Sequence, residues 1–240
     1  MYSQPAAANY YTPPAQYQKP RGYRICDRCG VVETPASRFR LCGGCMITQY
    51  CSPECQKIHW PGHKSICQHT QSQKQRASAS YAVSTDEDIV KNLRRFTSAH
   101  TTLLGWAGFQ ALQLKRVPSN IRQSALLIQL TPQSHPQSHR RFSIAGTHIV
   151  NPRKFIRDPL VLNDVRDREE RCRRNGGIGT LIIILQCGDV SQVLPVEVDP
   201  PSQITWDARE DWPQVLHHFV ESGRTDFQPI STTSGGIYYG

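Results

Sequence analysis

Residues 26–67 read CDRCGVVETPASRFRLCGGCMITQYCSPECQKIHWPGHKSIC and hold seven of the nine cysteines of this 240-residue chain. The candidate metal ligands of this stretch form four consecutive pairs: Cys26 and Cys29, Cys42 and Cys45, Cys51 and Cys55, and His63 and Cys67. Two ligands separated by two or three residues lie on one turn of the chain, close enough to bind a single ion. Because tetrahedral Zn²⁺ takes four such ligands, the four pairs predict two structural zinc sites with no open position for water or substrate.

The spacing alone leaves two questions open. Sequential pairing and interleaved pairing of the four ligand pairs satisfy the same counts, so the spacing does not say which pairs share an ion. His59 follows Cys55 by four residues and competes with His63 as the histidine ligand.

The same 42 residues resemble an MYND-type zinc finger, with its C-x2-C, C-x2-C, Y-C-x3-C, C-Q-x3-W and H-x3-C segments in order. The resemblance implies a cross-brace fold with interleaved sites. The first zinc is then held by Cys26, Cys29, Cys51 and Cys55, and the second by Cys42, Cys45, His63 and Cys67. His59 falls at the variable position before the family's tryptophan, so the resemblance implies that it is not a ligand. The Cys-x-His-x2-Cys block of RING fingers is absent.

Fingers similar to this one dock short proline-rich segments of partner proteins through the Gln and Trp of C-Q-x3-W, here Gln56 and Trp60. An extended proline segment has little entropy to lose on binding, and an indole offers it a flat apolar wall. Trp60 could also be the core of a very small domain, and the two roles are compatible. Gly43 stands where peptide-binding members often carry a small hydroxyl residue, so the resemblance implies altered peptide recognition here.

The rest of the chain divides by composition. Residues 1–24 are rich in Tyr, Pro, Gln and Ala without apolar periodicity, which predicts a disordered tail before the finger at 25–68. Residues 69–83 are polar and predict a linker, with partly helical structure as an alternative to an extended one. Residues 84–228 predict a small α+β domain of unknown role, and residues 229–240 a flexible tail.

Periodicity and turn residues predict the elements of the α+β domain. Ser84 and Glu87 have capping-box spacing, and apolar residues at steps of three or four predict one helix from there to about Lys115. The expected strands are 125–130, 141–150, 180–187 and 190–198, the last two forming a hairpin at Gly188. Further helices are expected at 158–174, capped by Asp158 and Pro159, and at 212–222.

Charge points in two directions on nucleic-acid binding. The net charge is +9, with 21 basic and 7 acidic residues in 1–160 against 7 and 12 in 161–240, an asymmetry that suits nucleic acid or an acidic partner but also an ordinary soluble surface. Seven thiolates and two Zn²⁺ would change the side-chain charge of the finger from +2 to −1, which suits phosphate poorly. No readout helix is evident either.

Proteins with a similar finger include lysine methyltransferases, in which the finger is an insert in a longer catalytic chain. This sequence has no Asn-His-Ser-Cys-like segment, and Gly176, Gly177 and Gly179 precede a predicted strand instead of following one. We therefore predict a non-catalytic interaction protein. Without a signal peptide or a run of about 18 apolar residues, we expect it away from membranes, in the nucleus or cytoplasm.

Overall fold

The computed structural model describes residues 25–31, 33–34, 36–79, 85–200, 203–233 and 236–238. The predicted disordered tail at 1–24 and the predicted helix cap Ser84 lie outside these residues. No helix in the described ranges is long and apolar enough to cross a membrane.

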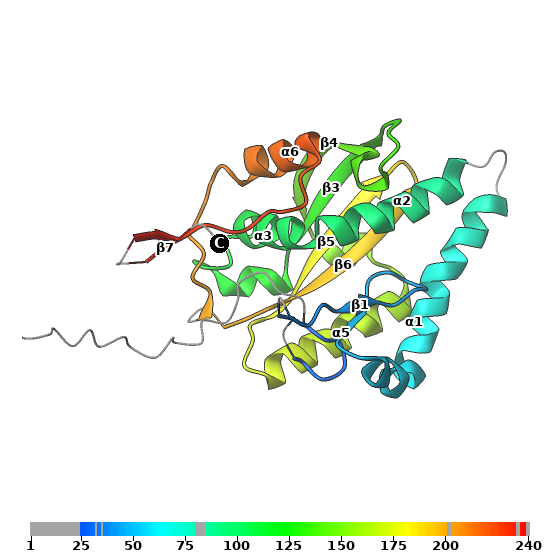
Figure 1. Ribbon diagram of the computed structural model, residues 1–240, viewed down its shortest axis with the longest axis horizontal. Helices are drawn as coiled ribbons and strands as arrows, with labels where there is room; N and C mark the ends of the chain where they lie inside the picture. Colours follow the sequence, from blue (N-terminus) through cyan, green and yellow to red (C-terminus); the bar gives the residue numbers. More distant parts are fainter. Residues whose placement is uncertain are drawn as a thin grey trace, which may run out of the picture.

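A four-stranded sheet lies at the centre of the larger domain (Figure 1). Its strands are β3 (Ala125–Pro132), β4 (Phe142–Val150), β5 (Gly179–Cys187) and β6 (Val190–Val198), in the order β4-β3-β5-β6. The hairpins β3–β4 and β5–β6 are antiparallel, whereas the central strands β3 and β5 run parallel. A parallel pair needs a crossover, and helix α5 (Pro159–Arg174) lies in it.

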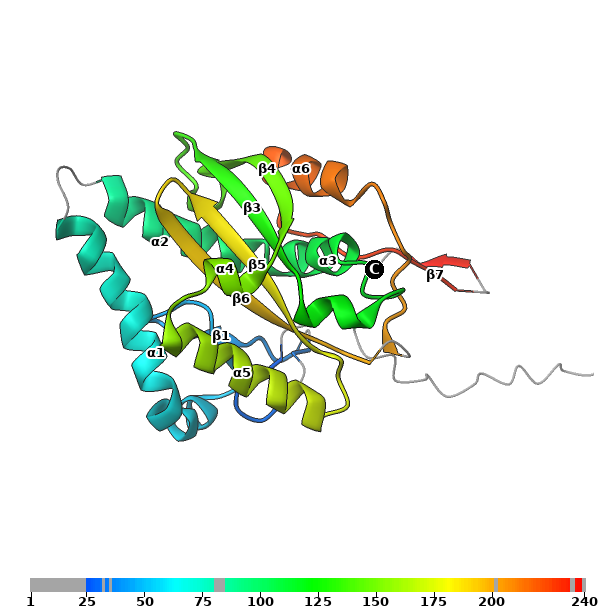
Figure 2. The same ribbon diagram turned by 180° about the vertical axis from the view of Figure 1, so that it is seen from behind.

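Helices cover both faces of the sheet, as the two opposite views show (Figures 1 and 2). Helices α2 (Thr85–Ala99), α3 (Thr101–Ala111) and α6 (Trp212–Ser222) pack on one face, and the short α4 (Pro152–Phe155) and α5 cover the other. Because side chains alternate along a strand, Leu181 and Ile183 of β5 join the first core, while Ile182 and Ile184 join the second. This double burial explains why β5 is apolar without interruption.

The single long helix predicted from residue 84 to Lys115 is wrong, because α2 ends at Ala99 and α3 begins at Thr101. The hydroxyl groups of Thr97 and Thr101 each donate to the carbonyl four residues earlier, at 2.8 Å. Such bonds from threonine bend helices, and periodicity does not reveal them. In α3, Gly108 allows the close approach of the sheet, since a Cβ there would lie 3.0 Å from Leu181.

Most of the predicted linker is helical, because α1 runs from Pro53 to Ala79. The linker residues of α1 are also held by the larger domain. His69 Nε2 lies 2.7 Å from Asp158, the N-cap of α5, and Arg94 of α2 donates to the carbonyl of Thr70. The finger and the α+β domain are therefore packed together, with α1 and the finger beside α5 (Figure 1).

The predicted flexible tail at 229–240 is partly held as well. Ser231 is fully buried, and its hydroxyl donates to the carbonyl of Thr205 over 2.6 Å. It begins strand β7 (Ser231–Thr233), which pairs with β8 (Gly236–Tyr238). The domain therefore extends past residue 228.

His100, at the break between α2 and α3, makes the stability of the fold depend on pH. Its side chain is 2% exposed and packs on Phe96, with His139 the nearest other titratable ring, and neither imidazole nitrogen has a hydrogen-bond partner in the described part of the chain. Burial lowers the pKa of His100 to about 4. In the unfolded chain this pKa is about 6.5, so the unfolded state takes up the proton first and the free energy of unfolding falls as the pH drops from about 6.5 towards 4.

Urea unfolding at pH 7 and pH 5 tests this. Wild type should lose about 2 kcal/mol more than His100→Leu between the two values. The zinc ligands titrate in both proteins, so the difference isolates His100. Equal losses in the two proteins would show that His100 is not held neutral by the fold.

Candidate metal centre

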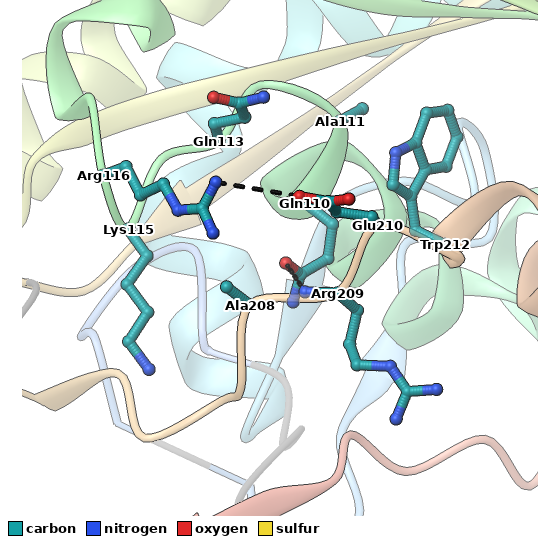
Figure 3. Close-up of a pocket in the computed structure, with 9 residues that line it drawn as sticks. All are labelled: Gln110, Ala111, Gln113, Lys115, Arg116, Ala208, Arg209, Glu210 and Trp212. Carbon is teal, nitrogen blue, oxygen red and sulfur yellow. Dashed lines mark hydrogen bonds and ion pairs between the residues drawn. The ribbon is translucent and has the colours of Figure 1, made fainter.

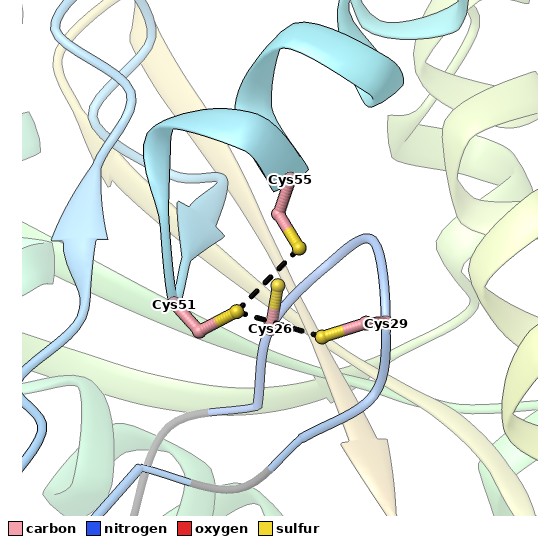
Figure 4. Close-up of side chains that lie close together, drawn as sticks. All are labelled: Cys26, Cys29, Cys51 and Cys55. Atoms are coloured by element: carbon pink, nitrogen blue, oxygen red, sulfur yellow. Dashed lines mark hydrogen bonds between the residues drawn. The ribbon is translucent and has the colours of Figure 1, made fainter.

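The first cysteine cluster joins the start of the finger to the start of α1 (Figure 4). Cys26 and Cys29 flank a turn, Cys51 precedes α1, and Cys55 lies in its first turn. The Cys51 sulfur is 3.5 Å from that of Cys29 and 3.5 Å from that of Cys55, and all four sulfurs lie within 4.8 Å of one another. Tetrahedral zinc with bonds of about 2.3 Å separates its sulfurs by about 3.8 Å, whereas a disulfide bond is about 2.05 Å long. The cluster therefore fits one ion.

The second cluster joins a hairpin to the middle of α1. Strands β1 (Arg40–Leu41) and β2 (Gln49–Tyr50) pair, and the turn between them carries Cys42 and Cys45. The Cys42 sulfur lies 3.6 Å from that of Cys67, and the Cys45 sulfur lies 3.5 Å from His63 Nε2. All four side chains are buried and lie within 4.8 Å of one another.

The structure has the interleaved grouping that the MYND resemblance implied. His63 and Cys67 are four residues apart and so share one face of α1, while Cys55 lies eight residues before His63. Eight residues span about 12 Å of helix, which places the two clusters side by side along α1. Three thiols with one imidazole, and four thiols, are the donor sets of closed structural zinc sites. The two clusters fit the two zinc ions of the finger.

His59 lies beside the second cluster without joining it. Its Nδ1 is 3.0 Å from the hydroxyl of Tyr50, and its ring stacks on that of His63. Burial lowers the pKa of His59. Thr48 Oγ1 lies 3.4 Å from Nδ1 of His63, which leaves Nε2 of His63 to face the cysteines.

Trp60 lies outside the core of the finger, which is formed by Phe39, Tyr50 and cysteine side chains. The indole is 38% exposed and packs edge-on against His63. With Pro53, Gln56 and Lys57 it lines a shallow groove of about 360 Å³. The predicted peptide-binding pair, Gln56 and Trp60, is therefore brought together at the surface of α1.

Sequence reasoning missed Gly44 and Asp27, which shape the two sites. A Cβ at Gly44 would lie 2.7 Å from the Cys67 sulfur and 1.9 Å from the Gln71 amide, so the second cluster leaves no room for one. Asp27 lies between Cys26 and Cys29, and its carboxylate accepts a hydrogen bond from the backbone of Gln49 at 2.7 Å. The spacing of residues in the sequence does not show that Asp27 is buried, since the residues that pair with it are distant in sequence.

A second hollow, of about 230 Å³, lies between the end of α3 and the segment before α6 (Figure 3). Its charged side chains are paired: Arg116 with Glu210 at 3.9 Å, Arg209 with Asp211, and Lys115 with the carbonyl of Trp206. Its lining residues include no cysteine, histidine or hydroxyl side chain. The paired side chains around this hollow therefore attach the segment before α6 to the end of α3, and the described residues that line it form no recognisable catalytic or metal-binding group.

Two neighbouring glycines test the second site. Gly44→Ala should lose one of the two zinc ions, because its Cβ would push the Cys67 sulfur out of place, whereas Gly43→Ala should keep both, because a Cβ at Gly43 meets nothing within 4 Å. Zinc per chain is measured by elemental analysis and native mass spectrometry. Two ions in Gly44→Ala, released no faster than from wild type, would contradict this geometry.

Comparison with known proteins supports this assignment of the finger. The family model described as MYND finger matches residues 26–67. Histone-lysine N-methyltransferase SMYD3 of Homo sapiens is 35% identical over 74 residues, which make up 30% of this chain and 17% of that protein. Dauer abnormal formation protein 25 of Caenorhabditis elegans is 44% identical over 43 residues, 18% of this chain and 11% of that protein. MYND-type zinc finger protein samB of Aspergillus clavatus is 41% identical over 51 residues, 20% of this chain and 8% of that protein.

The chain thus spans less than a fifth of the length of each of these curated relatives. No solved structure matches it at a significant level. The family model leaves the residues outside 26–67 unmatched. Residues 26–67 are therefore an MYND-type zinc finger, a domain of protein–protein interaction.

Proposed function

We propose that this is a non-catalytic interaction protein whose finger docks short proline-rich segments of partner proteins at Gln56 and Trp60. The observation that carries the proposal is the exposed groove on α1. The match to the MYND finger family supports a protein-interaction role of the finger that depends on zinc.

The groove has the chemistry that an extended proline segment needs. Pro53, Gln56, Lys57 and Trp60 follow one another at steps of three, one and three residues, so they share one face of α1. A polyproline-type segment makes no internal hydrogen bonds, and the Gln56 amide offers it both donors and an acceptor. The Trp60 indole supplies a flat apolar wall, and Lys57 favours an acidic residue near the prolines.

The absence of catalysis is part of the proposal, although a methyltransferase is among the relatives. Each zinc cluster has four protein ligands and no open position. Cys172 and Cys187, the two cysteines outside the finger, are buried, and burial raises the pKa of both thiols, which makes them poor nucleophiles. Reduced zinc thiolates fit the nucleus or cytoplasm, where we propose that the protein acts.

Peptide binding tests the proposal with one variant in the groove, one in the turn between β1 and β2, and one control. The probe is an array of fluorescein-labelled peptides that carry two prolines separated by zero to three residues, read by anisotropy. Trp60→Ala should weaken the best peptide about 30-fold or more, since a central aromatic anchor contributes about 2 kcal/mol. Gly43→Ser should bind at least as tightly as wild type, because the position has free space around it.

Ile58→Ala is the matched control, because Ile58 is 59% exposed on the same helix and does not line the groove. It should bind like wild type. The proposal fails if no peptide of the array binds, or if Trp60→Ala and Ile58→Ala behave alike while both retain two zinc ions.

A further inference from the structure

A single buried arginine of α5, Arg168, contacts groups beside both zinc sites. Its guanidinium pairs with the Asp27 carboxylate and lies 3.5 Å from the Thr48 hydroxyl, and its Nε donates to Asp164 at 2.9 Å. The Arg168 side chain is 8% exposed. Asp27 and Thr48 are 141 and 120 residues away in sequence, so Arg168 joins the α+β domain to the finger.

Asp27 connects Arg168 to the first site. It is the residue after Cys26, its carboxylate accepts from Gln49 N at 2.7 Å, and its own N–H donates to Gln49 O at 2.9 Å. Arg171, one turn further along α5, donates to the Asp27 carbonyl at 2.6 Å. The turn that carries Cys26 and Cys29 is therefore fixed between β2 and α5.

Thr48 connects Arg168 to the second site. Its hydroxyl lies 3.4 Å from Nδ1 of His63 and 3.6 Å from the sulfur of Cys45. A hydrogen bond to the remote nitrogen sets the tautomer and orientation of a metal-binding histidine. By holding the Thr48 hydroxyl, Arg168 acts on His63 through one intermediate group.

Charge gives a reason for these contacts. Four thiolates around Zn²⁺ carry a net charge of −2, and three thiolates with a neutral histidine carry −1. Arg94 of the α+β domain faces this negative charge at the second site, where it donates to the carbonyl of Gly44 at 3.3 Å. Arg168 and Arg171 are instead paired with the carboxylates of Asp27, Asp164 and Glu197. Arg94 therefore offsets part of the excess charge of the second centre, and Arg168 and Arg171 act through Asp27.

We propose that Arg168 is a positioning residue that holds the ligand geometry of both zinc sites, and that residues 84–228 act as a fixed scaffold of the finger. The finger then presents its α1 groove in one orientation relative to that domain. This inference does not depend on which partner the groove binds.

Zinc release to a chromogenic chelator tests the role of Arg168. Arg168→Leu and Arg168→Lys should each release both ions about 10-fold faster or more, the usual effect of losing a partner of a metal ligand. Lysine keeps the positive charge, but it lacks the planar guanidinium that lets Arg168 contact Asp27 and Thr48 at the same time. Arg173→Leu is the control, since the exposed Arg173 is on the same helix and pairs only with Glu169 among its described contacts.

Site-specific variants separate positioning from general loosening of the fold. With cobalt in place of zinc, the four-thiolate and three-thiolate sites have distinct absorption bands. Thr48→Val should speed the loss of the three-thiolate band alone, and Asp27→Asn that of the four-thiolate band. If Arg168→Leu fails to fold, Arg168→Lys decides the question. Wild-type release rates in Arg168→Lys, or equal effects of Thr48→Val on both bands, would overturn the proposal.

Discussion

Zinc–thiolate coordination at two crossed sites is the constraint on which the finger depends. The apolar core of these 42 residues consists of little besides Phe39, Tyr50 and cysteine side chains, and the two strands are two residues long. So small a unit has too little core to fold unaided, whereas each structural zinc ion contributes about 10 kcal/mol of folding free energy. The ions tie the turns at Cys26 and Cys42 to two points about 12 Å apart along α1, and they thereby set where the groove at Trp60 lies.

The larger domain also places arginine side chains against the negatively charged groups of the finger. The thiolate centres carry excess negative charge, and Arg94 of residues 84–228 contacts the backbone of the second centre at Gly44, while Arg168 and Arg171 pair with the Asp27 carboxylate of the finger. Asp27 is buried, and a buried carboxylate needs a charged partner. It pairs with both Arg168 and Arg171. Finger and scaffold are thus complementary in charge, which spacing in the sequence does not reveal.

The sequence predicted the local features of this molecule better than the long-range ones. Ligand spacing predicted two zinc sites, but only the family resemblance indicated that Cys26 shares a cluster with Cys55, because that choice depends on the path of the chain. The apolar run of β5 and the Asp158 cap of α5 identified those elements, since both signals are local.

The wrong predictions fall where distant contacts override composition. A polar composition allows a partly helical linker at residues 69–79, but it does not show that this helix is held by the larger domain through His69 and the carbonyl of Thr70. The break at His100 depends on hydroxyl-to-carbonyl bonds that an apolar pattern ignores. Ser231 is buried and bonded to the carbonyl of Thr205, 26 residues away in sequence. The polar composition of the tail does not reveal this distant contact.

Hydrogen exchange with and without zinc tests most directly whether finger and scaffold form one unit. The full chain is compared before and after removal of both ions by a chelator, with peptides read by mass spectrometry. Zinc removal should abolish protection in α1 and also lower it in α5 around Arg168 and Arg171, while the central strands β3 and β5 stay protected. Unchanged protection of α5 in the zinc-free protein would contradict the account and show that the finger is an independent module.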